Sequence, residues 1–173
     1  LELIPDLDFI SQMAAVQKKL IATGIPMCVP EYRAESEKAF TAEGMCDPNL
    51  ALNAYDRNEP VNVVPNDITF DERGRIYLLT GPNSGGKSVF MRTVGLIQIM
   101  AQIGMLVPAR KAVVSPASAI LVELSYQNSS SDIGGRFELE CRAFREIFRK
   151  VDGHSLLIID EAFSSTNPNE AVM

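Results

Sequence analysis

The chain alternates between helical and strand-like patterns of apolar residues, with turn-forming residues between them. Apolar residues recur at helical spacing over residues 6–23, 87–103 and 137–151, and each pattern predicts a helix. Gly24 and Gly104 are placed to end the first two of these helices. The middle helix is apolar almost all round, so we expect it to be buried on most sides.

Short apolar or β-branched runs predict the strands. Residues 155–159 form a continuous apolar run of the length expected for a buried central strand. Residues 75–80 follow a hairpin-like turn at residues 71–74, and further strands are expected at residues 61–64, 68–70, 111–114 and 119–124. Strands that alternate with helices predict an α/β fold with a mixed, mostly parallel sheet.

Residues 25–52 show no sustained pattern. Prolines and a glycine divide this stretch into short segments such as residues 27–29, which predict brief strands or loops. Residues 31–38 carry both signs of charge and are expected to form a solvated face, and residues 53–58 to form a polar turn.

Length and composition indicate one globular domain, and we expect the chain to be a piece of a longer protein. The 173 residues are 46% apolar and 22% charged, which suits one domain with a small appendage. A net charge of −6 disfavours nucleic-acid binding by this segment, so DNA contacts would come from other domains. Cys28, Cys46 and Cys141 are odd in number and widely spaced, which favours reduced cysteines in a cytoplasmic protein. No apolar run reaches membrane-spanning length, so we expect no membrane partner.

Residues 81–88, G-P-N-S-G-G-K-S, match the phosphate-loop pattern G-x-x-x-x-G-K-[ST]. Such a loop turns from a strand into a helix around a phosphate chain. Its backbone N–H groups point at the ligand, and the helix N-terminus adds partial positive charge. We expect Lys87 to reach the β- and γ-phosphates and the Ser88 hydroxyl to ligate Mg²⁺. A chance glycine-rich turn is the alternative, and the apolar patterns on both sides of the loop disfavour it.

Asp160 and Glu161 follow the last predicted strand. At the carboxyl end of a buried strand, Asp160 would hold Mg²⁺ beside Ser88, and Glu161 would orient the attacking water or accept its proton. The alternative is a strand that ends in solvated acids. The phosphate loop earlier in the chain favours the metal and catalytic roles.

The run from Thr80 to Ala109 resembles the nucleotide-binding domain of the MutS family of DNA mismatch-repair ATPases. The likeness rests on Pro82-Asn83, Met91-Arg92 and the exit Val107-Pro108-Ala109. Together with similar segments at residues 64–67 and 157–161, it covers roughly residues 61–171. The resemblance implies an ABC-like P-loop NTPase fold. Residues 1–24 would be a helical lead-in from the lever region, and residues 25–173 the ATPase domain, truncated after its second nucleotide motif.

The resemblance also implies ligands, partners and residue roles. ATP and Mg²⁺ would be the cofactors, with Ser88 and Asp160 at the metal, Glu161 and Lys87 as the catalytic residues, and Val63 against adenine. The residues at the phosphates would be Gly81, Pro82, Asn83, Ser84, Gly85, Gly86, Lys87, Ser88 and Val89. A second copy would pair through the ATPase domain to form a homo-dimer, and DNA would bind other domains of the full-length protein.

Several residues depart from the family pattern. Val63 stands where the family has an aromatic residue, and Val89 where it has threonine. The family's signature Ser-Thr-Phe appears as Gly135-Arg136-Phe137, and residues 162–168 replace a glycine-rich turn. Arg136 is therefore either a guanidinium that acts on the partner's nucleotide or an ordinary solvent-facing arginine.

These departures leave more than one function open. The first is a Mg²⁺-dependent ATPase that, in the full-length dimer, couples ATP to conformational switching on mismatched DNA. The second is a nucleotide-gated dimerisation module with little turnover or a role outside mismatch repair. A third, an ABC-type ATPase unrelated to DNA, is disfavoured by the Gly-Pro-Asn-Ser loop and the Val107-Pro108-Ala109 exit.

Overall fold

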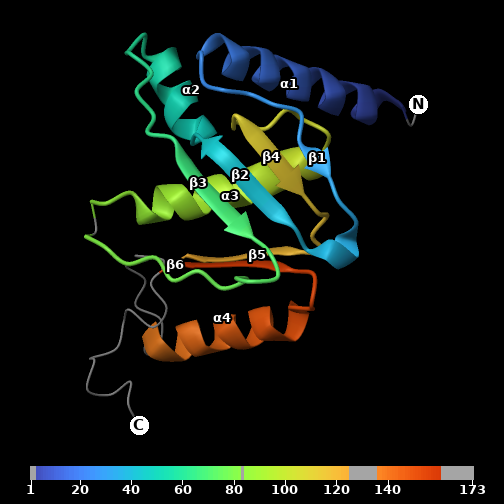
Figure 1. Ribbon diagram of the computed structural model, residues 1–173, viewed down its shortest axis with the longest axis vertical. Coiled ribbons are helices and arrows are strands. Elements are labelled where there is room, and N and C mark those ends of the chain that lie inside the picture. Colours follow the sequence, from blue (N-terminus) through green and yellow to red (C-terminus); the bar gives the residue numbers. More distant parts are fainter. Residues whose placement is uncertain (1–2, 83, 125–135, 161–173) are drawn as a thin grey trace. The chain divides into compact units, whose positions relative to one another are not determined.

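Figure 1 shows a computed structural model of the chain, which describes residues 3–82, 84–124 and 136–160. The chain divides into two compact units, Leu1–Pro116 and Ala117–Met173. The division of the chain into a lead-in over residues 1–24 and a domain over residues 25–173 stays a prediction.

In the described residues, the first unit combines three α-helices and a short 3-10 helix with a four-stranded sheet. Its elements in chain order are α1 (Leu3–Ala22), β1 (Glu31–Tyr32), a short 3-10 helix (Glu35–Glu37), β2 (Phe40–Met45), α2 (Pro48–Asp56), β3 (Asn66–Phe70), α3 (Lys87–Gln102) and β4 (Lys111–Val114). The strand order is β1-β4-β2-β3. β1 is parallel to β4, whereas β2 is antiparallel to both β3 and β4. This sheet is therefore mixed, as expected, but mostly antiparallel, because central β2 runs opposite to both of its neighbours.

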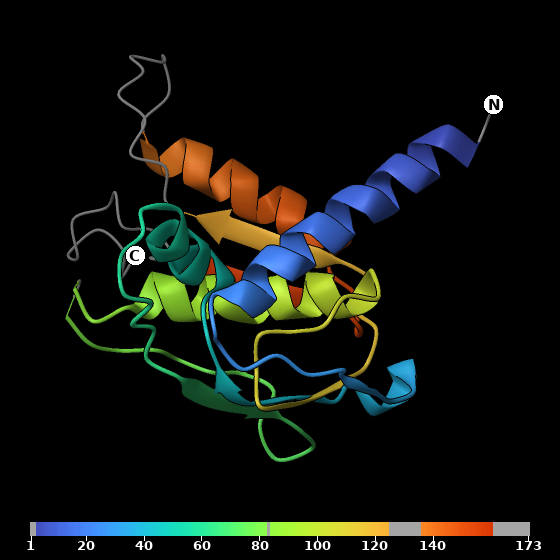
Figure 2. The same cartoon turned by 90° about the horizontal axis from the view of Figure 1, so that it is seen from above.

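Helix α3 crosses one face of this sheet (Figures 1 and 2). The Tyr32 hydroxyl donates to the carbonyl of Ala101 at 2.7 Å, and the Gln98 amide donates to the carbonyl of Ser115 at 2.9 Å. Buried apolar side chains from the helix and the strands form the core: Phe40, Ala42, Val94, Ile97, Met100, Ala101, Ala112 and Val114. The predicted burial of α3 holds for this side of the helix, while Ile99 is 42% exposed.

The glycines expected to end the first two helices do so. α1 ends at Ala22, followed by Gly24 with φ 80°. After α3, the N–H of Gly104 donates to Ala101 at 3.0 Å and the N–H of Met105 donates to Met100 at 2.9 Å, which satisfies two of the last carbonyl groups.

Strand β2 and helix α2 were not predicted from the sequence patterns. The predicted polar turn at residues 53–58 was wrong for its first four residues, which belong to α2. Asp47 caps this helix through a hydrogen bond from the N–H of Leu50, and Pro48 occupies its first turn. In β2, Gly44 has φ 61° at a register shift, and the guanidinium of Arg110 occupies the space that a Cβ would need.

Two predicted strands before the phosphate loop are not strands in the structure. Residues 61–64 and 75–80 have no ladder partner among the described residues, although the turn at Asp71 forms as expected. Tyr77 instead donates its hydroxyl hydrogen bond to Thr69 and meets the Phe70 ring edge-on at 4.8 Å. An apolar run becomes a strand only when a neighbouring strand offers free backbone groups, which local sequence does not reveal. Residues 27–29 contribute a single bridge, from Cys28 to Val107.

The second unit contains β5 (Ile120–Leu124), α4 (Arg136–Lys150) and β6 (Leu156–Asp160). β5 and β6 pair in parallel, with Ile120 opposite Leu156, and α4 lies between them in the sequence and packs against β5. This is the strand–helix–strand arrangement predicted for parallel neighbours. In the part of the chain that the structure describes, no helix has the length and apolarity needed to cross a membrane.

Candidate functional site

The phosphate loop leads directly into α3 and is closed by its own hydrogen bonds. The N–H of Gly85 donates to the carbonyl of Pro82 at 2.9 Å. The Lys87 ammonium reaches back across the loop to the carbonyls of Gly81 and Pro82, at 2.8 and 2.9 Å. The lysine is thus held over the loop, where it can meet a phosphate chain.

Gly86 lets the loop turn into the helix. It is the N-cap residue of α3 with φ 79°, in the left-handed region that glycine adopts without a steric penalty. Because the cap is a glycine, no cap side chain covers the N–H groups of the first turn, and no acidic residue lies in that turn. The partial positive charge of the helix N-terminus then favours an anion at this point.

The other predicted loop residues lie around this turn. Ser84 and Ser88 are exposed, and Val89 is half-buried. Asn83 lies outside the described residues. The structure thus brings the described part of the loop together as one turn at the N-terminus of α3.

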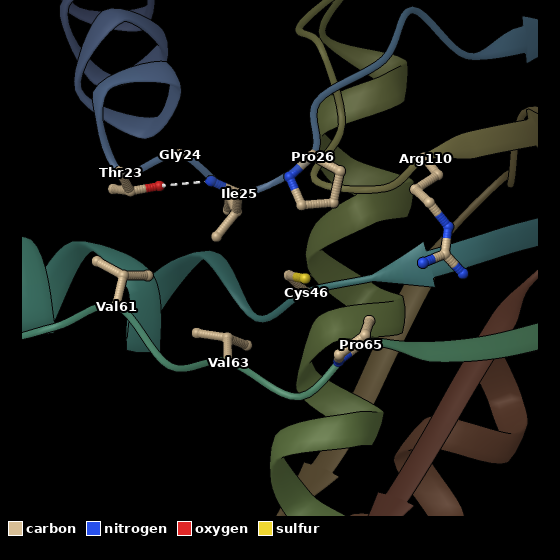
Figure 3. Close-up of a pocket in the computed structure, with 9 residues that line it drawn as sticks. All are labelled: Thr23, Gly24, Ile25, Pro26, Cys46, Val61, Val63, Pro65 and Arg110. Atoms are coloured by element: carbon tan, nitrogen blue, oxygen red, sulfur yellow. Dashed lines mark hydrogen bonds between the residues drawn. The ribbon is translucent and has the colours of Figure 1, made fainter.

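Val63 lines a cavity of about 230 Å³ in the first unit. Figure 3 shows its wall, which is formed by Thr23, Gly24, Ile25, Pro26, Cys46, Val61, Val63, Pro65 and Arg110. Burial raises the pKa of the Cys46 thiol, and the positive charge of Arg110 opposes this in part. The thiol therefore stays protonated at neutral pH, and the cavity combines apolar walls with one cationic group.

The second nucleotide motif lies in the other unit. Asp160 is the last residue of β6 and is half-buried, whereas Glu161 lies outside the described residues. Arg136 opens α4, but its side chain and Gly135 are also outside the description. Because Ser88 and Asp160 belong to different units, their shared metal site stays a prediction.

The chain matches the MutS domain V family over residues 77–172, a range that contains the phosphate loop and the Asp160-Glu161 pair. It belongs to the MutS family. This confirms the resemblance inferred from Pro82-Asn83 and the Val107-Pro108-Ala109 exit, at the level of the family.

Curated relatives carry two different names. The chain is 38% identical over 102 residues to the DNA mismatch repair protein MutS of Prochlorococcus marinus, covering 59% of the chain and 11% of the relative. It is 36% identical over 109 residues to the Endonuclease MutS2 of Thermus thermophilus, covering 63% and 15%. It is 30% identical over 170 residues to the Endonuclease MutS2 of Latilactobacillus sakei, covering 98% and 20%. The chain thus spans a fifth or less of these relatives' length.

In this MutS-family chain, Asp47 contacts the helix that follows the phosphate loop, and the sequence patterns did not predict this contact. Asp47 is 2% exposed, and its carboxylate meets Arg92 and Thr93 on the second turn of α3. Its available signal was an Asp followed by Pro48, a pair typical of a helix N-terminus. That signal would have found the cap of α2, but not the contact with α3, which joins residues 45 positions apart.

Proposed function

We propose that this chain binds ATP with Mg²⁺ at the phosphate loop and, within the full-length protein, hydrolyses it. The observation that carries the proposal is the loop geometry: Gly86, a glycine N-cap without a capping side chain, turns the loop into α3, and the Lys87 ammonium is held at the loop carbonyls of Gly81 and Pro82. Membership of the MutS domain V family supports the same assignment.

The proposal gives each site residue a role. The loop N–H groups and Lys87 bind the phosphates, while Val63 and its cavity take the adenine base. Ser88 and Asp160 would hold Mg²⁺, which neutralises charge on the phosphate oxygens when bound. Glu161 would orient the attacking water and accept its proton.

The proposal extends to the whole protein. ATP would drive a conformational change on mismatched DNA. The Prochlorococcus relative, which is named a DNA mismatch repair protein, supports this proposal. DNA would bind through other domains, because this segment carries a net charge of −6. Two copies would pair through the ATPase domain, and the proposal assigns the protein to the cytoplasm.

Two variants of the full-length protein test the ATPase proposal. Lys87→Ala should abolish nucleotide binding, because it removes the ammonium from the phosphate site. Glu161→Gln should keep binding but slow hydrolysis, because an amide cannot accept the water's proton. Nucleotide affinity and steady-state phosphate release are measured on both. Turnover equal to the parent's in both variants refutes the proposal.

A second candidate is a nucleotide-gated dimerisation module with little turnover or a role outside mismatch repair. The sequence Gly135-Arg136-Phe137 favours it, because the hydroxyl of the family signature is replaced. Relatives named Endonuclease MutS2 also favour a role other than mismatch repair. A burst of phosphate release without steady-state turnover would support this module, whereas sustained turnover supports the ATPase. Arg136→Ala tests the trans role, and unchanged dimerisation and turnover would exclude it.

A further inference from the structure

Asp47 joins the two helices α2 and α3 through a buried carboxylate. One oxygen, Oδ1, accepts the N–H of Leu50 at 2.8 Å and so caps α2. The other, Oδ2, accepts from Nε of Arg92 at 3.0 Å and also lies 3.0 Å from Nη2 of the same guanidinium. The Asp47 side chain is 1% exposed, so its carboxylate is shielded from water, whereas the Arg92 side chain is 45% exposed.

The neighbouring Thr93 adds a second contact from the same turn of α3. Its hydroxyl oxygen lies 3.1 Å from Oδ2 of Asp47 and 2.8 Å from the carbonyl of Val89, and the residue is 3% exposed. The single hydroxyl proton is shared between these two acceptors, so Asp47 contacts two consecutive residues of α3, Arg92 and Thr93.

These contacts are one turn away from the phosphate-binding end of the helix. Arg92 lies four residues after Ser88, and Thr93 four residues after Val89, so each pair shares a face of α3. A helix moves largely as a rigid rod over so short a distance. The position of its second turn therefore sets where Lys87 and the first N–H groups stand, and displacements of about 1 Å in such groups weaken a site strongly.

We propose that Asp47 is a positioning residue for the phosphate loop. It holds the second turn of α3 against the N-terminus of α2. The loop then presents its hydrogen-bond donors in the geometry that a nucleoside triphosphate needs. This inference rests on the proposed ATP site. A buried ion pair is weak evidence for stability on its own, which makes affinity the informative readout.

The same segment also reaches the cavity that contains Val63. Cys46, immediately before Asp47, lines that cavity together with Arg110. Consecutive residues thus contribute to the cavity wall and hold the phosphate-binding helix. Asp47 thereby fixes the helix relative to the segment that lines the cavity.

The test uses the full-length protein and Mg-ATP, with affinity measured by calorimetry at a temperature where every variant is folded. Asp47→Asn keeps an N-cap acceptor for Leu50 but removes the charge from Arg92 and Thr93. We expect ATP affinity about tenfold weaker. Asp56→Asn, at the other end of α2, is the matched control: it breaks the exposed ion pair with Lys19 of α1 and should leave affinity unchanged.

A double-substitution cycle separates positioning from general destabilisation. Arg92→Gln, at a half-exposed residue, should weaken ATP binding as Asp47→Asn does, and Arg92→Lys should recover most of the loss. The double variant should bind ATP no more weakly than either single variant, because both substitutions remove the same Asp47–Arg92 ion pair. If the loss of ATP affinity in the double variant equals the product of the two single losses, the inference is wrong.

Lys87→Ala distinguishes the two proposals. If Lys87→Ala binds ATP like the parent, the proposed site itself fails. If Lys87→Ala loses binding while Asp47→Asn and Arg92→Gln bind ATP like the parent, the site stands and the positioning role is wrong.

Discussion

At the scale of single residues, sequence patterns identify functional residues that are neighbours in the chain. They miss contacts between residues that are far apart in the chain. Gly86, Lys87 and Ser88 were predicted from their spacing, and the structure forms the turn that this spacing implies. Asp47 carries no such pattern, because its partner Arg92 is distant in the sequence. A carboxylate that satisfies two helices is recognised only once those helices are placed.

Asp152 gives a prediction at the same scale, in the turn between α4 and β6. Its carboxylate accepts hydrogen bonds from Ser118 Oγ at 2.7 Å, the N–H of His154 at 2.8 Å and Ser155 Oγ at 2.9 Å. These bonds, the Ser118 bond first, lower the pKa of Asp152 from 3.8 to about 2. Because the folded pKa lies below the unfolded one, the stabilisation is complete above pH 3.8 and is lost as the pH falls towards 2.

We therefore expect Ser118→Ala to bring the pKa of Asp152 back towards 3.8, since it removes the largest cause of the shift. A carboxyl-carbon NMR titration of the full-length protein, with Asp152→Asn to assign the signal, measures this. A midpoint that stays near 2 in Ser118→Ala would show that the Ser118 bond does not set the pKa.

At the scale of elements, helical periodicity and short apolar runs predicted much of the regular structure, although α1 leaves most of its apolar residues exposed. α1, α3, α4, β5 and β6 were all expected near their observed bounds. α2 was missed because its nine residues include two asparagines, and its cap and the burial of Ala51 stabilise it instead. The prediction for residues 75–80 was wrong in the opposite way. Their sequence is typical of a strand, but they have no partner strand among the described residues.

Two isoleucines on α3 provide a matched prediction about this element. Ile97 is 0% exposed and Ile99 is 42% exposed. Ile97→Ala should lower the free energy of unfolding by about 3 kcal/mol, because it leaves a cavity between α3 and the sheet. Ile99→Ala should cost under about 1 kcal/mol. Hydrogen exchange of the α3 amides in the full-length protein measures both, and equal losses of protection would contradict the packing of this helix.

At the scale of the whole molecule, the nucleotide motifs are divided between two compact units. The phosphate loop belongs to Leu1–Pro116, and Asp160 to Ala117–Met173. Family membership followed from the sequence, because the phosphate loop and its exit are distinctive runs of neighbouring residues. The metal site required Ser88 and Asp160 to meet, which no local pattern can show.

The proposed ATP site in the phosphate loop is open to a direct binding test. Calorimetric titration of the full-length protein with Mg-ATP, for the parent, Lys87→Ala and Lys111→Ala, tests it directly. Lys111 is a suitable control because it is an exposed lysine on β4, outside the loop. We expect saturable binding by the parent and Lys111→Ala and none by Lys87→Ala. Binding of Mg-ATP by Lys87→Ala with the parent's affinity would contradict this proposal.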